Sequence, residues 1–108
     1  MVDDETGAPA GSVGYWKREW GGEEIYETGW LVLPEFQGRG VATEATRQAI
    51  SAARADGGPG RMHAFPGVEN AASNAICRRL GFNLAGEIEF EYPPGSTMRC
   101  NDWWLDIL

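Results

Sequence analysis

A glycine junction between an apolar run and an alanine-rich run constrains the fold of this chain more than any other feature. The apolar run covers residues 30–33, the junction is Gly38-Arg39-Gly40, and apolar side chains then recur at helical spacing to about residue 55. This order predicts a strand, a tight turn and a helix. The N–H groups at a helix start lack intrahelical partners and suit an anion. A plain turn with a solvated basic edge explains these residues equally well.

Turn residues and apolar spacing predict the other elements. Residues 11–20 and about 23–33 are predicted strands joined at Gly21-Gly22, because both central positions of a type I′ turn need positive φ. A helix is predicted over about 40–55, and its buried face carries Val41, Ala45, Ala49 and Ala52. A second helix is predicted over 70–80 and ends at Gly81 and Phe82. Further strands are predicted over 61–65, near 87–92 and near 98–108. We expect one α/β (α+β) domain over residues 1–108, with a mixed, largely antiparallel sheet, two packed helices and the order β-β-α-β-α-β-β.

Composition excludes several classes of function. The formal net charge of −7 argues against nucleic acid and against anionic membrane surfaces, since both need a basic face. The apolar runs are too short to span a bilayer. Cys77 and Cys100 have no metal-ligand spacing, so we expect no metal site. With an acidic start instead of a secretory signal, we expect a cytoplasmic protein with both thiols reduced.

Two nucleotide-binding motifs are poor matches to the glycine junction. Gly38-Arg39-Gly40 begins the dinucleotide fingerprint, but that fingerprint needs glycine or alanine at its sixth position, where this chain has Thr43. The fingerprint also needs an acidic residue at the end of the next strand, whereas Asp56 precedes that strand. The Lys-Ser/Thr pair of the P-loop is absent from the junction.

Two segments together resemble the GNAT superfamily of N-acetyltransferases. Its cofactor loop, Gln/Arg-x-x-Gly-x-Gly/Ala, is matched by Gln37, Gly40 and Ala42. Thirty residues after Gly40, the stretch ENAASNAICRRLGF resembles the superfamily's second cofactor segment at Asn70, Ser73, Leu80, Gly81 and Phe82. The ending MRCNDWWLDIL also resembles the branch that includes ribosomal-protein N-acetyltransferases.

The resemblance implies acetyl-CoA as cosubstrate, held in a V-shaped gap beside the loop. It places the diphosphate on the backbone amides of Gln37, Gly38, Arg39, Gly40, Val41, Ala42 and Thr43. It places the pantetheine arm along the backbone of Leu31, Val32 and Leu33, near Asn70, with the thioester sulfur near Ser73. The acceptor is then a primary amine, either a protein N-terminus or a small molecule.

Catalytic candidates are few, and each has a structural alternative. Glu27 is the candidate base, and the alternative is a solvated or paired strand carboxylate. Ser73 is the candidate acid, or only a cofactor contact, because Cys77 stands where many relatives have tyrosine. We expect Cys77 to be a small buried apolar residue. His63 is expected to be a packed, hydrogen-bonded strand residue, with a base as the alternative.

The resemblance covers only part of the family domain. Such domains usually have a strand, two helices and a further strand before the hairpin at which this chain begins. We therefore expect a partner subunit, in a homodimer, to supply the missing wall of the acceptor site. The alternative function is a coenzyme A-binding or interaction domain without catalysis.

Overall fold

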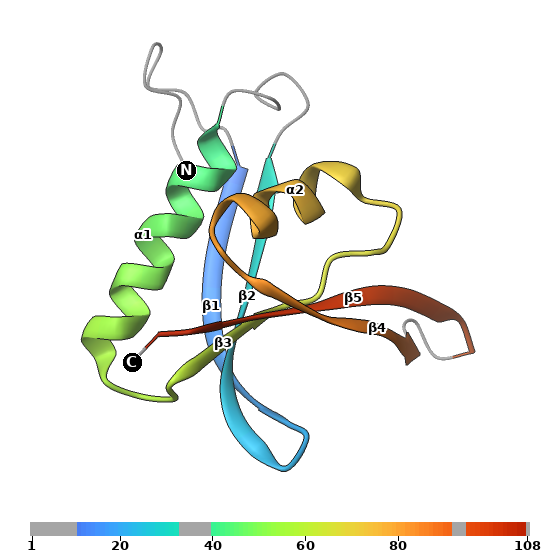
Figure 1. Ribbon diagram of the computed structural model, residues 1–108, viewed down its shortest axis with the longest axis horizontal. Coiled ribbons are helices and arrows are strands. Elements are labelled where there is room, and N and C mark those ends of the chain that lie inside the picture. The colour runs from blue at the N-terminus through green and yellow to red at the C-terminus, as the bar shows by residue number, and fades with distance from the viewer. Residues whose placement is uncertain (1–10, 33–39, 92–94, 108) are drawn as a thin grey trace.

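The computed structural model describes residues 11–32, 40–91 and 95–107, which form one sheet and two helices (Figure 1). The elements are β1 (Gly11–Trp20), β2 (Glu23–Val32), α1 (Val41–Asp56), β3 (Arg61–Ala64), α2 (Ala71–Arg79), β4 (Asn83–Glu91) and β5 (Thr97–Asp106). The predicted order and the mixed α+β class are confirmed. None of the helices in these ranges is long and apolar enough to cross a membrane.

The sheet contains one short parallel pair, and this pair determines where the gap lies. The strand order is β1-β2-β3-β5-β4, with β3 in the centre, and every pairing except that of β2 with β3 is antiparallel. The parallel pairing joins only Tyr26 to Met62 and Glu27 to His63. Beyond these residues β2 continues without β3 beside it, so the two strands separate.

Both helices pack on the same face of the sheet, where the core lies. The core residues are Tyr26, Ile50, Ala53, Met62, Ala64, Cys77, Phe82, Trp103 and Ile107. They come from α1, α2 and the strands β2, β3 and β5, together with the residue just before β4 and the residue just after β5. Neither helix covers the opposite face, which we call the open face.

The buried face of α1 differs from the predicted one. The buried residues are Ala42, Thr46, Ala49, Ile50 and Ala53, so Ala49 alone is shared with the prediction and Ala52 is exposed. Alanine occurs on buried and exposed helix faces alike, so its spacing carries little directional information. The larger Ile50 side chain and the β-branched Thr46 turn the helix toward the core instead.

The predicted glycine turns are confirmed. Gly21 and Gly22 have φ values of 59° and 83°, as a type I′ turn needs. At the end of α2, Gly81 has φ 86°, and the Phe82 N–H donates to the Cys77 carbonyl at 3.0 Å. This is the bond of a Schellman helix end.

The open face is curled so strongly that its two edge strands touch. Trp20 of β1 lies 5.6 Å from Phe90 of β4, measured between ring centroids, although β1 and β4 are the outermost strands. Phe65, just after β3, contacts both rings at 4.9 Å and 5.4 Å. These three side chains, hereafter the aromatic box, cover part of the open face.

Candidate functional site

A pocket of about 200 Å³ occupies the gap between β2 and β3. Its lining consists of Glu27, Thr28, Gly29, Trp30, Ala64, Phe65, Pro66, Asn70 and Ser73. Three residues singled out from the sequence, Glu27, Asn70 and Ser73, therefore lie around one cavity. Trp30 packs against the core on the helix side, whereas Glu27 pairs in register with His63 and shares the open face with it. The pocket thus connects the two faces of the sheet.

The Ser73 hydroxyl is held by a tryptophan across the pocket. The indole Nε1–H of Trp30 donates to Ser73 Oγ at 3.1 Å. Because a hydroxyl can accept and donate at once, this bond orients Ser73 and leaves its proton available. The geometry is compatible with Ser73 as a proton donor, and that role stays a prediction.

Asn70 uses one side of its carboxamide to begin α2. Its Oδ1 accepts from the Ser73 N–H at 3.1 Å, which is an N-cap bond. The Nδ2 group makes no hydrogen bond within the described ranges and remains as a donor at the pocket. If Asn70 contacts a pantetheine arm, the donor of that hydrogen bond is therefore Nδ2.

Asn74, which sequence analysis missed, ties α2 to the sheet. Its Nδ2 donates to the carbonyls of Gly67, at 3.0 Å, and Asn70, at 2.8 Å. Its Oδ1 accepts from Asn101 Nδ2 and from Trp103 Nε1, both at 2.8 Å. A signal was available, because asparagine is disfavoured inside helices unless its side chain finds specific partners.

The start of α1 has main-chain donors that find no partner within residues 11–32, 40–91 and 95–107. Gly40 occupies the N-cap position with φ 75° and has no side chain with which to cap the helix. The first intrahelical bond runs from Glu44 N–H to the Gly40 carbonyl at 3.1 Å, so the N–H groups of Val41, Ala42 and Thr43 precede the ladder. A Cβ built on Gly40 meets nothing within 4 Å, so this approach to the helix start is open among the described atoms.

The rest of the predicted cofactor loop lies outside the described residues. This applies to Leu33, Gln37, Gly38 and Arg39. Leu31 and Val32 belong to β2, where they pair with β1 on one edge. On the other edge, β2 has no strand partner beyond Glu27 within the described ranges, which leaves main-chain groups for an extended ligand.

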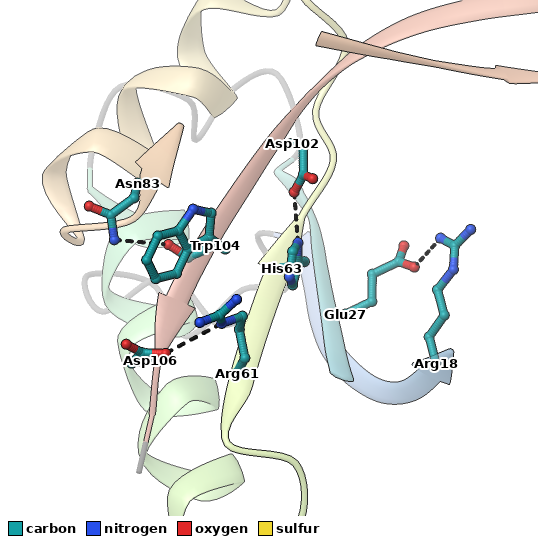
Figure 2. Close-up of polar contacts among 8 residues, drawn as sticks. All are labelled: Arg18, Glu27, Arg61, His63, Asn83, Asp102, Trp104 and Asp106. Atoms are coloured by element: carbon teal, nitrogen blue, oxygen red, sulfur yellow. Dashed lines mark hydrogen bonds and ion pairs between the residues drawn. The ribbon is translucent and has the colours of Figure 1, made fainter. Parts of the chain in front are cut away.

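Glu27 is held by an ion pair that the sequence did not indicate. Arg18 Nη1 donates to Glu27 Oε1 at 2.5 Å, and the two side chains are 34% and 19% exposed, respectively (Figure 2). The expectation of a paired strand carboxylate is thereby confirmed. Whether this carboxylate also serves as a base stays a prediction.

A buried histidine–aspartate pair lies one strand away from Glu27. His63 Nδ1 is 2.7 Å from Asp102 Oδ1, and both residues are buried (Figure 2). His63 is therefore the packed, hydrogen-bonded strand residue that was predicted.

The cysteines are poor nucleophiles. Burial raises the pKa of the Cys77 thiol to about 12, and burial also raises the pKa of Cys100. Cys77, fully buried, therefore cannot replace the tyrosine that many relatives carry at its position. Among the described residues, no group of three or more His, Cys, Asp or Glu side chains is arranged to hold a metal ion.

Known proteins similar to this chain share its fold. The family model of the acetyltransferase (GNAT) domain matches residues 1–83. Over 83 residues the chain is 29% identical to YnaD, an uncharacterised N-acetyltransferase of Bacillus subtilis strain 168. The aligned residues cover 77% of this chain and 46% of YnaD. The structure of yncA, a putative acetyltransferase from Salmonella typhimurium with its cofactor acetyl-CoA, matches with a TM-score of 0.79 at 24% identity, over 94% of this chain and 60% of yncA.

A third similar protein is of the kind suggested by the C-terminal sequence. RimL, a ribosomal L7/L12 α-N-protein acetyltransferase, matches at 27% identity with a TM-score of 0.67, over 77% of this chain and 53% of RimL. The chain thus spans about half to three-fifths of the length of these relatives. Since the family model covers most of its residues, the chain belongs to the GNAT acetyltransferase family.

Proposed function

We propose that this chain acts as an acetyl-CoA-dependent N-acetyltransferase that transfers the acetyl group to a primary amine. The observation that carries the proposal is the pocket between the separated strands β2 and β3, which brings Glu27, Asn70 and Ser73 together. The family membership supports it, as does the fold shared with yncA, whose structure contains acetyl-CoA.

The cofactor would approach from the helix side. The N–H groups of Val41, Ala42 and Thr43 offer partial positive charge to the diphosphate, and the free edge of β2 offers hydrogen bonds to the pantetheine arm. The net charge of −7 does not prevent this, because salt screens distant charges beyond roughly 8 Å while the helix-start donors act at contact.

The acceptor would reach the pocket from the open face, where Glu27 lies. A neutral amine attacks the thioester carbonyl, the carbon–sulfur bond breaks and the coenzyme A thiolate leaves. At pH 7 an α-amine is neutral about one time in ten, and a lysine amine about once in two thousand. We therefore favour α-amino groups and small amines of low pKa as acceptors, with Glu27 binding or deprotonating the ammonium. The Ser73 hydroxyl would protonate the leaving thiolate and take up in turn the proton that the attacking amine gives up.

A homodimer is part of the proposal. The open face includes Trp16, which is 46% exposed, and Leu31, which is 63% exposed. A second copy covering this face would complete the acceptor site. A fully active monomer in analytical ultracentrifugation would contradict this part, and the cytoplasmic location likewise stays a prediction.

The test combines coenzyme A binding with thiol release. Calorimetry measures binding of coenzyme A, and acetyl-CoA is then offered with peptides, polyamines and aminoglycosides while free thiol is recorded. We expect binding and turnover with at least one amine. Binding without turnover would favour the alternative of a non-catalytic domain, whose support is the buried Cys77. Absence of binding would overturn the proposal.

Two variants then assign roles. Glu27→Gln should lower kcat/KM about 100-fold and Ser73→Ala about tenfold, within the usual range of proton-transfer catalysis, with coenzyme A affinity unchanged. Glu87→Gln is the matched control, because Glu87 lies exposed on β4 and contacts Arg99. Equal activity of Glu27→Gln and the control would show that Glu27 has only a structural role.

A further inference from the structure

Arg18 is held beside the pocket by contacts that cofactor binding does not explain. Its guanidinium carbon lies 5.2 Å from the ring centroid of Trp20, 5.4 Å from that of Phe65 and 5.2 Å from that of Phe90. The same group donates to Glu27, which lines the pocket. Arg18 therefore connects the aromatic box to the acceptor end of the site.

The aromatic box makes Arg18 a fixed charge rather than a mobile one. Arginine on a surface normally loses rotamer freedom when it binds a ligand, which weakens binding. Here three rings, themselves in mutual contact, already restrict the guanidinium. A ligand would meet a charge that is already in position.

Most of the N–H donors of Arg18 have no hydrogen-bond partner among the described residues. A guanidinium carries five N–H donors, and the described structure assigns one hydrogen bond to Arg18, the one to Glu27. The side chain is 34% exposed, so an anion can reach the remaining donors. Planar N–H pairs of arginine bind carboxylates in preference to single acceptors.

We propose that the acceptor carries a carboxylate close to its reacting amine, and that Arg18 determines this specificity by binding the carboxylate. The acceptor ammonium would lie beside Glu27 and its carboxylate beside Arg18, so that two ion pairs align head to tail. A cationic group next to the amine would be repelled by Arg18. The acceptor is then a free amino acid, or a peptide with an acidic residue next to its N-terminus.

This inference rests on the proposed acetyl transfer, and matched acceptors test it. The peptides Ala-Asp-Ala-amide and Ala-Asn-Ala-amide have nearly the same shape and differ in the charge beside the amine, and Ala-Lys-Ala-amide places a positive charge there. We expect kcat/KM for the Asp peptide to exceed that for the Asn peptide about tenfold, mainly through KM, with the Lys peptide lowest. Free alanine against alaninamide, compared at equal concentrations of neutral amine, distinguishes an amino acid from a peptide as the source of the carboxylate.

Variants assign the preference to Arg18. Arg18→Met keeps an apolar chain within the aromatic box and removes the charge, so the ratio between Asp and Asn peptides should fall to about one. Arg18→Lys should restore part of the ratio, which a purely structural role would not predict. Arg99→Met is the matched control, because Arg99 pairs with Glu87 and Glu89 on exposed surface. Thermal unfolding and coenzyme A affinity confirm that each variant is folded.

The outcomes separate this inference from the proposed function. Turnover of all three peptides at equal kcat/KM, or a ratio that Arg18→Met leaves intact, would overturn the inference and leave acetyl transfer standing. If Arg18→Met fails to fold, the ratio of kcat/KM between the Asp and Asn peptides, measured for the wild type and for Arg18→Lys, still tests the inference. If amines without a carboxylate are the only acceptors acetylated, the inference is overturned and acetyl transfer stands. If no amine of the wider panel is acetylated, acetyl transfer fails, and equal peptide affinities measured by tryptophan fluorescence would then overturn the inference as well.

Discussion

The two helices begin in opposite ways. At α1, Gly40 adopts φ 75° and contributes no side chain, so no cap reaches the first N–H groups from the residues that the structure describes. At α2, the Asn70 side chain accepts from the Ser73 N–H, and Asn74 adds bonds to the loop and to β5. The chain thus leaves main-chain donors available at one helix start and uses side chains to secure the other. The first suits an anion, and the second suits a rigid pocket wall.

The buried polar residues of the two helices show the same contrast. Asn74 is engaged at both its oxygen and its nitrogen. Thr46 of α1 is fully buried, and its Oγ1 has no hydrogen-bond partner in the part of the chain that the structure describes. Packing by shape therefore holds the buried face of α1, and an exposed hydrogen bond from the Tyr15 hydroxyl to Asp56 ties its last residue to β1, whereas buried hydrogen bonds determine the position of α2.

The largest expected effect is on stability, from Asn74→Ala. The variant leaves the side-chain donors of Asn101 and Trp103 without their acceptor and removes one of the two bonds made to each of two carbonyls, so the free energy of unfolding should fall by about 3 kcal/mol. Urea denaturation measures the change. Asn83→Ala is the control, because Asn83 is exposed and makes one bond of 3.5 Å, to the Trp104 carbonyl. A loss below about 1 kcal/mol would show that the network does not secure α2.

Next in size is the effect of charge at the start of α1. Gly40→Asp should weaken coenzyme A binding about thirtyfold, equal to roughly 2 kcal/mol, because a carboxylate there repels a diphosphate. Gly40→Asn is the matched control. Asn and Asp both tolerate positive φ, so the two variants carry the same backbone strain and differ only in charge. Calorimetry with coenzyme A compares them. Equal affinities would mean that the open helix start does not bind the diphosphate.

Asn70 separates capping from ligand contact. Asn70→Ala removes the cap and should lower the free energy of unfolding by about 1 kcal/mol. Asn70→Asp keeps a capping oxygen but loses the Nδ2 donor, so it should stay near wild-type stability and bind coenzyme A more weakly. Denaturation and calorimetry of both variants measure the two effects. If Asn70→Asp binds coenzyme A as tightly as the wild type, Asn70 caps α2 and does not contact the ligand.

The smallest effect is expected at Thr46. Thr46→Val replaces an unpartnered buried hydroxyl by a methyl of similar shape, which should raise the free energy of unfolding by about 1 kcal/mol or less. The midpoint of urea denaturation should rise with the slope unchanged. A decrease would reveal a partner for the hydroxyl and weaken the contrast between the two helices.

Much of the pocket follows from short stretches of sequence, but its side-chain partners do not. Asn70 and Ser73 are three positions apart on one helix, so a motif places them together. Glu27 was expected near them through the family resemblance. Its partner Arg18 was not, because that contact depends on the β1–β2 hairpin register, which sets Arg18 opposite Ile25, diagonal to Glu27. The α1 face was wrong because several alanines compete for the same buried stripe.

By itself, the sequence determined the features that depend on neighbouring residues. The hairpin turn at Gly21-Gly22 and the end of α2 at Gly81 are of this kind, since backbone sterics and local hydrogen bonds are encoded within a few positions. Tertiary structure alone decided how the curled sheet brings Trp20, Phe65 and Phe90 around Arg18. Those contacts join residues of β1 and β4 and the residue just after β3, and they depend on strand order and twist, which no local pattern specifies.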